Sequence, residues 1–158
     1  MQNQQKQIRY QIKILNATIY DFNSILSIEK DLKLPTTNFK LFSNLIELDK
    51  IFVVKVIPSN QLIGFVELQG DLEETEIITL GVKKNFQNQG YGKQLINFII
   101  KKNYKNIFLE VSLSNLKALN FYKSLGFKRI SIRKNYYRSV KNQNDAFILN
   151  YKNCLTKF

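Results

Sequence analysis

The apolar pattern of residues 51–82 constrains the fold more than any other feature of this sequence. Two β-rich runs, at 51–57 and 62–68, are joined by the four residues PSNQ, whose proline, serine and asparagine suit a turn. A third β-rich run, at 77–82, follows the polar sequence GDLEE. Three short strands separated by turns predict an antiparallel meander.

A helix is predicted directly after this meander. Gly92, Leu95, Ile96 and Ile99 fall at positions i, i+3, i+4 and i+7, which places them on one face of a helix from Gly90 to about Lys102. Such a face packs against a sheet.

The remaining elements surround this centre. A strand that starts at Ile8, a helix at 18–32 and a second helix after Pro35 and Thr36 precede it. A strand at 107–111, a helix at about 115–125 that stops at Gly126, and strands at 127–133 and 145–151 follow it. This order predicts an α/β (α+β) fold with a mixed, mostly antiparallel central sheet of about seven strands and helices on both faces.

The length of 158 residues suits one domain and is too short for two of ordinary size. We expect a flexible N-terminus at 1–7, a single domain at 8–152 and a tail at 153–158. No apolar run approaches the roughly 18 residues of a membrane span, and the start lacks the apolar core of a secretory signal. A cytosolic protein without a membrane partner is expected.

Several kinds of chemistry are excluded by composition. The sequence contains no histidine, which rules out Ser-His-Asp catalysis and the usual zinc sites, so no metal is expected. Its single cysteine, Cys154, rules out an internal disulfide framework.

The chain is strongly basic. Lysine and arginine outnumber acidic residues 24 to 12, which gives a net charge of +12. This favours anionic partners such as nucleic acid, coenzyme phosphates or a ribosome surface. The abundance of lysine, asparagine and isoleucine equally fits a biased coding sequence. Charge alone therefore assigns no function.

The sequence QNQGYG, between the strand that ends at Val82 and the next helix, predicts an anion site. A helix N-terminus presents free backbone N–H groups and the positive end of its dipole. Gly90 and Gly92 allow close approach of a pyrophosphate, Lys93 adds a positive charge and Tyr91 an apolar wall. The alternative is a glycine pair that only makes a tight turn. The patterns of P-loop and dinucleotide-binding proteins are absent.

Glu110, Asn115 and Tyr122 are candidate functional residues. Glu110 interrupts the apolar run IFLEV, so it is either a strand-end residue that faces solvent or a lysine, or a base that takes a proton from a substrate amine through water. Asn115 is either a helix N-cap or a ligand contact. Tyr122 shares a helix face with Phe121 and Leu125, which by itself indicates a core residue.

The motifs together resemble a known family. LGV at 80–82, then QNQGYGK and an apolar helix, resemble motif A of the GNAT acetyltransferases. The stretch LEVSLSNLKALNFYKSLGFKRISIRKNYY, followed by DAFIL, is similar to the RimI-type ribosomal-protein N-terminal acetyltransferases within that family. This resemblance extends over residues 77–149. Arg138 replaces the proline that usually follows the two tyrosines, and Asn150 stands near the usual methionine.

The resemblance implies acetyl-CoA as co-substrate. Glu110 stands at the position of the general base and Tyr122 at that of the general acid. A bulge near Gly81 would expose backbone groups to the pantetheine arm, and the N–H of Val82 would meet the oxyanion. Tyr136 and Tyr137 stand where the family holds the first residues of its substrate. The implied cofactor-binding residues are Leu80, Gly81, Val82, Gln87, Asn88, Gln89, Gly90, Tyr91, Gly92, Lys93 and Asn115.

The predicted function is transfer of an acetyl group from acetyl-CoA to a protein N-terminal α-amine by direct attack, with ribosomal protein S18 as the acceptor that the resemblance implies. One alternative is a GNAT acetyltransferase of other protein N-termini or small amines. Another is a basic module that binds RNA or the ribosome without catalysis. In the predicted function, nucleic acid is a partner only through the ribosome.

Overall fold

The computed structural model describes residues 10–134 and 145–153. Ile8, the expected start of the first strand, lies outside these ranges, as do residues 1–7 and most of the expected tail. The strands are β1 (Gln11–Asn16), β2 (Ile51–Ile57), β3 (Gln61–Gly70), β4 (Glu74–Val82), β5 (Asn106–Ser112), β6 (Lys128–Arg133) and β7 (Ala146–Lys152). The helices are α1 (Phe22–Leu32), α2 (Phe39–Glu47), α3 (Tyr91–Ile100) and α4 (Leu116–Ser124), with 3₁₀ turns η1 (Ile19–Asp21) and η2 (Lys84–Phe86).

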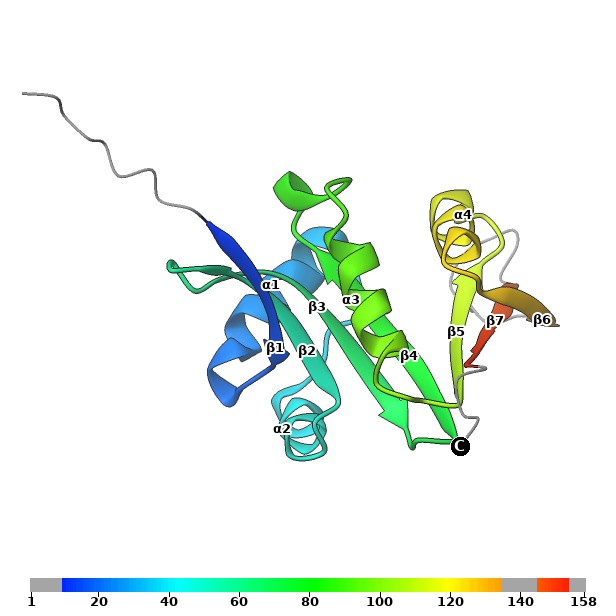
Figure 1. The fold of residues 1–158 in the computed structure, drawn as a ribbon, viewed down its shortest axis with the longest axis horizontal. Helices are drawn as coiled ribbons and strands as arrows, with labels where there is room; N and C mark the ends of the chain where they lie inside the picture. Colours follow the sequence, from blue (N-terminus) through cyan, green and yellow to red (C-terminus); the bar gives the residue numbers. More distant parts are fainter. Residues whose placement is uncertain (1–9, 135–144, 154–158) are drawn as a thin grey trace, which may run out of the picture.

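The strands form one seven-stranded sheet in the order β1-β2-β3-β4-β5-β7-β6 (Figure 1). Neighbouring strands are antiparallel except β4 and β5, which are parallel and connected through α3. The predicted mixed, mostly antiparallel sheet is confirmed. Because the sheet contains one parallel pair, its connection needs a crossover, and α3 supplies it.

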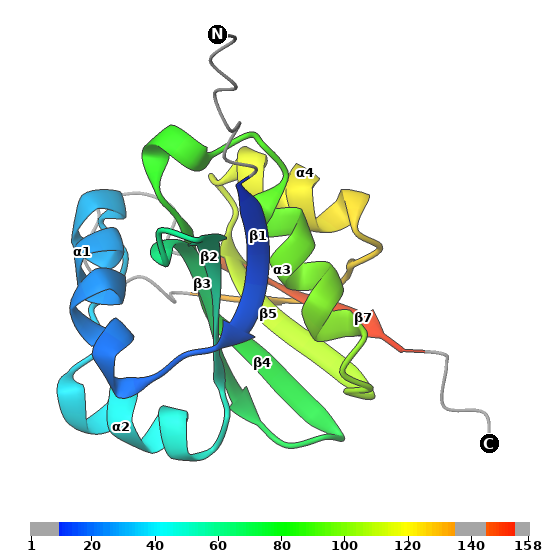
Figure 2. The same ribbon diagram turned by 60° about the vertical axis from the view of Figure 1, so that its left-hand side comes forward.

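Helices cover both faces of the sheet, as predicted (Figure 2). One core contains buried residues of α3, such as Leu95, together with Phe52. The other contains Ile25 of α1 and Phe42 of α2, packed on Val53. Consecutive β2 residues thus enter opposite cores, which explains why β2 is apolar at every position except Lys55 and does not alternate. None of the helices in the described ranges is long and apolar enough to cross a bilayer.

Strands β4 and β5 pair over only three residues. Their partners are Glu74 with Asn106, Thr75 with Ile107 and Glu76 with Phe108. Beyond Glu76 the two strands diverge toward their C-terminal ends, as Figure 1 shows. An opening within the sheet results.

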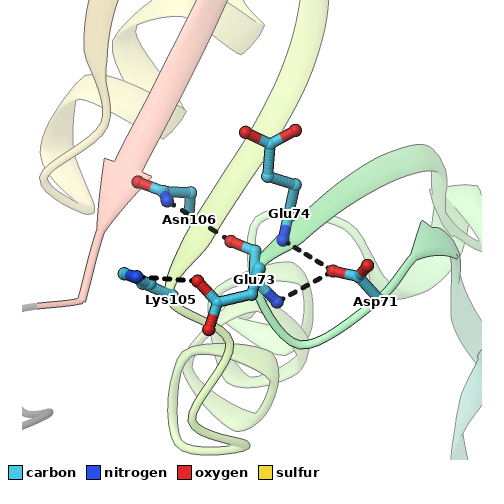
Figure 3. A network of polar contacts seen from close by, with 5 residues as sticks. All are labelled: Asp71, Glu73, Glu74, Lys105 and Asn106. Carbon is cyan, nitrogen blue, oxygen red and sulfur yellow. Dashed lines mark hydrogen bonds and ion pairs between the residues drawn. The ribbon is translucent and has the colours of Figure 1, made fainter.

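Polar contacts fix the closed end of this opening (Figure 3). Asp71 Oδ1 accepts from the backbone N–H groups of Glu73 and Glu74, at 2.8 and 3.0 Å. Lys105 Nζ lies 2.7 Å from Glu73 Oε2, and the side chain of Asn106 donates to the carbonyl of Glu73 at 3.3 Å. The β3–β4 turn is therefore tied to the start of β5 where pairing begins.

The bulge expected near Gly81 lies elsewhere. Glu67 pairs with Thr79 and Leu68 with Ile77, so the extra residue of β4 is Ile78. Gly81 pairs regularly with Phe65. The expectation was wrong because Gly81 is needed for close packing against Phe65 and Ile28 and not for a bulge.

The space around Gly81 is too small for a side chain. A β-carbon at this position would lie 2.7 Å from a ring carbon of Phe65 and 3.1 Å from a methyl of Ile28. We expect Gly81→Ala to lower the free energy of unfolding by about 1–3 kcal/mol, because the buried ring of Phe65 must shift within a packed core. Urea unfolding would measure this.

Gly92→Ala is the matched control for stability. Its added methyl would approach no atom closer than 3.6 Å. Equal unfolding midpoints for Gly81→Ala and the unsubstituted protein would contradict the packing argument.

Candidate active site

The predicted anion site is a turn that ends in the first residue of α3. Asn88 and Gly90 have positive φ angles, 60° and 87°, and Gly90 is the N-cap of α3. A β-carbon at Gly90 would meet no atom within 4 Å. Its backbone conformation, and not crowding within the protein, therefore favours glycine, and the space beside it is open.

The backbone N–H groups of residues 88–93 are unpaired within the described part of the chain. The first N–H of the helix to bond back is that of Gln94, at 2.9 Å from the carbonyl of Gly90. Six free donors at a helix N-terminus, with the exposed side chain of Lys93 beside them, suit a pyrophosphate.

Two glutamines brace this turn. The amide nitrogen of Gln87 donates to the carbonyl of Val82 at 3.0 Å, and that of Gln89 donates to the carbonyl of Asn85 at 2.9 Å. Their side chains thus hold the turn on its own backbone. Sequence reasoning had assigned both to the cofactor.

A cavity of about 810 Å³ fills the opening between β4 and β5. It extends from the turn before α3 to the residues after α1, including Leu34 and Pro35. Glu110 and Tyr122 both line it. The predicted cofactor residues that line it are Leu80, Val82, Gln87, Asn88, Gly90, Tyr91, Gly92, Lys93 and Asn115. The structure thus brings most of the predicted site together around one space.

Gly81 and Gln89 do not line this cavity. The N–H of Lys83 bonds the carbonyl of Ile63, across the pair of Gly64 and Val82. In an antiparallel ladder this turns the N–H and C=O of Val82 away from β3, toward the opening, whereas those of Gly81 bond to Phe65. Gly81 therefore offers the opening no backbone group.

A second cavity, of about 320 Å³, adjoins the first. It lies over the paired ends of β4 and β5 and includes Glu74 and Ile148. The two cavities share Glu76, Leu109 and Glu110. Two carboxyl groups therefore lie where the cavities meet.

Glu110 neither faces solvent nor pairs with a lysine, and its role as a base stays a prediction. Its Oε1 accepts from Arg133 Nη1 at 2.8 Å. Its side chain is only 12% exposed, and Oε2 is buried without a hydrogen-bond partner in the described ranges. An ion pair thus orients this carboxylate, while its second oxygen can accept a proton.

Glu76 is a site residue that sequence reasoning missed. Burial raises its pKa, the charge of Glu110 raises it further, and Arg133 partly opposes the change. Glu76 comes one residue before the predicted strand 77–82. A prediction of a longer strand would have placed Glu76 beside the strand predicted at 107–111.

Tyr122 is buried at the cavity wall. Its ring packs edge-on against Phe121 and Phe127, with centroid distances of 5.0 and 5.3 Å. Burial raises the pKa of its phenol above the usual value, so the hydroxyl keeps its proton at neutral pH. Tyr122 can therefore donate a hydrogen bond into the cavity.

Asn115 is the N-cap of α4, which was one of its two predicted roles. Its Oδ1 accepts from the backbone N–H of Ala118 at 3.1 Å. The side-chain NH₂ stays available at the cavity edge within the described part of the chain. Capping and ligand contact are thus compatible.

Tyr136, Tyr137 and Arg138 lie outside the described ranges, so the role expected of the two tyrosines stays a prediction. In residues 10–134 and 145–153, no cluster of three or more His, Cys, Asp or Glu side chains could hold a metal ion.

Comparisons with known proteins show which family the chain resembles. The family model described as acetyltransferase (GNAT) family matches residues 19–127. The [ribosomal protein bS18]-alanine N-acetyltransferase of Haemophilus ducreyi is 35% identical over 122 residues, which cover 74% of this chain and 83% of that protein. The protein of the same name from Haemophilus influenzae is 32% identical over 74% of this chain and 82% of its own.

Solved structures share the fold. The ribosomal-protein-S18-alanine N-acetyltransferase from Escherichia coli superposes with a TM-score of 0.78 at 24% identity, over 93% of this chain and 97% of its own. Arabidopsis thaliana Naa50, in complex with the bisubstrate analogue CoA-Ac-MVNAL, superposes with a TM-score of 0.77 at 19% identity, over 89% and 98% of the two chains.

Proposed function

This chain belongs to the acetyltransferase (GNAT) family, and we propose that it transfers the acetyl group of acetyl-CoA to the N-terminal α-amine of ribosomal protein bS18. One observation carries the proposal: a single cavity joins the anion site at α3 to Glu110 and Tyr122. The names of the relatives supply the acceptor. With a ribosomal acceptor, we propose that the enzyme acts in the cytoplasm.

The coenzyme would be held by backbone groups. The free N–H groups of residues 88–93 and the ammonium of Lys93 would bind its pyrophosphate, because they offer donors and positive charge at one place. Leu80, whose N–H and C=O groups point into the opening, would bond its pantetheine arm, whereas the carbonyl of Val82 already accepts from Gln87. The thioester supplies an activated acetyl group.

The acceptor amine must lose a proton before it reacts. An α-amine has a pKa of about 7.7–8.0, so much of it is protonated at neutral pH. Glu110 Oε2, buried and unpaired among the described residues, would take this proton, directly or through a water. Arg133 would hold the carboxylate in place through Oε1.

The neutral amine would then attack the thioester carbonyl. A C–N bond forms and the C–S bond breaks, and the nitrogen releases its second proton to solvent. The N–H of Val82 would stabilise the oxyanion, and Tyr122 would protonate the departing thiolate. No covalent enzyme intermediate is needed.

Glu76 would tune this proton transfer, because its carboxyl is coupled to that of Glu110. We expect Glu76→Gln to move the acid limb of the kcat/KM profile to lower pH. The reason is that glutamine cannot carry the negative charge that an ionised Glu76 places beside Glu110, and two neighbouring carboxylates repel each other. Rates measured across the acid range would test this, and an unshifted limb would contradict the coupling.

The proposed function is tested with purified protein, acetyl-CoA and a peptide that carries the bS18 N-terminus. Mass spectrometry should find one added acetyl group at the α-amine. A panel of other N-terminal peptides and small amines, tested in parallel, should react more slowly. Binding of acetyl-CoA without transfer to any acceptor would contradict the proposal and favour a non-catalytic module.

A further inference from the structure

Two buried carboxyl groups lie between α1 and the sheet, away from the acetyl-transfer residues. Glu29 of α1 is fully buried and Glu67 of β3 is 2% exposed. Both bond to Thr37, which lies in the connection between α1 and α2. The backbone N–H of Thr37 also donates to Glu29 Oε2, at 3.1 Å. This cluster joins a helix, a connection and a strand.

The hydroxyl of Thr37 cannot satisfy both carboxylates. Its Oγ1 lies 3.0 Å from Glu29 Oε1 and 3.1 Å from each carboxyl oxygen of Glu67. A hydroxyl has one hydrogen to donate, although it can also accept. Two ionised carboxylates would leave one of the two without a hydrogen from Thr37 and would repel each other. When the pair holds one proton, the hydroxyl can donate to one carboxylate and accept from the other carboxyl group.

The number of hydrogen bonds favours Glu67 as the carboxyl that carries this proton. Glu29 accepts two bonds from Thr37, through the N–H and the hydroxyl, as a carboxylate does. Glu67 then donates to the hydroxyl oxygen. Burial, followed by the charge of Glu29, raises the pKa of Glu67 to about 7, against hydrogen bonds from Thr37 and Thr79. Burial also raises the pKa of Glu29, but both bonds from Thr37 lower it.

The neighbouring charged groups have other partners or are exposed. Lys55 of β2 is occupied by Asp21, at 2.7 Å. Glu76 of β4 is coupled to Glu110 and Arg133. The other charged residues on or next to α1 and α2 are exposed: Lys30, Asp31, Lys33, Lys40 and Glu47.

The α1–α2 connection, which contains Thr37, borders the acetyl-transfer cavity. Its residues Lys33, Leu34 and Pro35 line the larger cavity. A methyl of Leu34 packs 3.3 Å from where a β-carbon of Gly81 would be. Thr37 follows two residues after Pro35, so its contacts fix the distance of this segment from β3.

We propose that Glu29, Thr37 and Glu67 form a proton-sharing clamp that positions the α1–α2 connection at the mouth of the acetyl-transfer cavity, with Glu67 as a positioning residue. The effect on acceptor binding rests on the proposed function, whereas the shared proton does not. The pKa of Glu67 rises on folding from 4.5 to about 7, so its stabilisation is complete below about pH 4.5 and is lost as the pH rises through about 7.

Glu67→Gln tests the clamp, because its neutral amide can donate to Thr37 at every pH. Infrared spectra at about pH 6 should show a protonated carboxyl band in the wild type that is absent from the variant. Between about pH 5.5 and 8.5, the melting temperature should fall further in the wild type than in Glu67→Gln. Over the same range, the ratio of KM for the acceptor peptide in the wild type to KM in Glu67→Gln should rise with pH, while kcat stays similar in the two proteins.

Glu47→Gln, at an exposed position of α2, is the control and should follow the wild type in every measurement. Equal loss of melting temperature in Glu67→Gln and wild type, or the same carboxyl band in both, would overturn the clamp. Should Glu67→Gln not fold, the wild-type infrared titration decides: a protonated carboxyl that disappears near pH 7 supports the clamp, and its absence at about pH 6 refutes it. If the spectra are as expected but no acetylation is found, the proposed function is refuted and the clamp is still supported.

Discussion

Replacing Glu110 by glutamine is expected to lower kcat/KM at neutral pH by about 10²–10⁴-fold, the usual contribution of a general base. The amide keeps an oxygen for Arg133, so the position of the side chain is retained, while the proton-accepting carboxylate is lost. Affinity for acetyl-CoA should change little, because the turn before α3 is untouched. Steady-state kinetics with the bS18 peptide and equilibrium binding of acetyl-CoA would separate these effects.

The pH dependence makes this prediction sharper. Above about pH 8 most of the α-amine is already neutral, so the deficit of Glu110→Gln should shrink. Glu47→Gln serves as the control, since that carboxylate is exposed on α2. A variant as active as the wild type at neutral pH would exclude Glu110 as the base.

Tyr122→Phe should lower kcat by about 10²–10³-fold, within the range of lost general-acid catalysis. The substitution removes only the hydroxyl, and the ring contacts with Phe121 and Phe127 remain. Thermal stability should therefore stay close to that of the wild type. Single-turnover measurements with saturating acetyl-CoA would place the loss in the chemical step.

A second buried tyrosine gives a matched control. Tyr104 is 5% exposed, but it is absent from the lining of both cavities. Tyr104→Phe should leave kcat unchanged. Equal rates for the two phenylalanine variants would argue that the Tyr122 hydroxyl takes no part in the reaction.

The architecture could be predicted because its elements carry strong local patterns. The helix face of Leu95, Ile96 and Ile99 and the β-rich run of β2 both appear in the structure where the sequence placed them. The spacing of Glu110 and Tyr122 also located two residues that line one cavity. These features depend on sequence periodicity or on a motif.

Features that depend on contacts between distant segments were not predicted. Gly81 looked like a bulge residue because glycine weakens a strand, but its lack of a side chain admits Phe65 and Ile28. The bulge at Ile78 depends on how β3 and β4 align. Glu76 becomes a site residue only because β5 lies beside it, and the pairing of Glu29 with Glu67 depends on how α1 packs. No pattern within a single segment reveals such partners.

The short pairing of β4 and β5 has a consequence for molecular recognition. Leu80 and Val82 direct backbone groups away from β3, and at these positions β5 does not pair with β4. An extended pantetheine arm, which has amides of its own, would fill that vacancy as a guest strand. Recognition of this kind depends on the spacing of amides along the guest and hardly on the side chains of the host. Sequence can therefore drift along this part of β4 while the same coenzyme continues to fit.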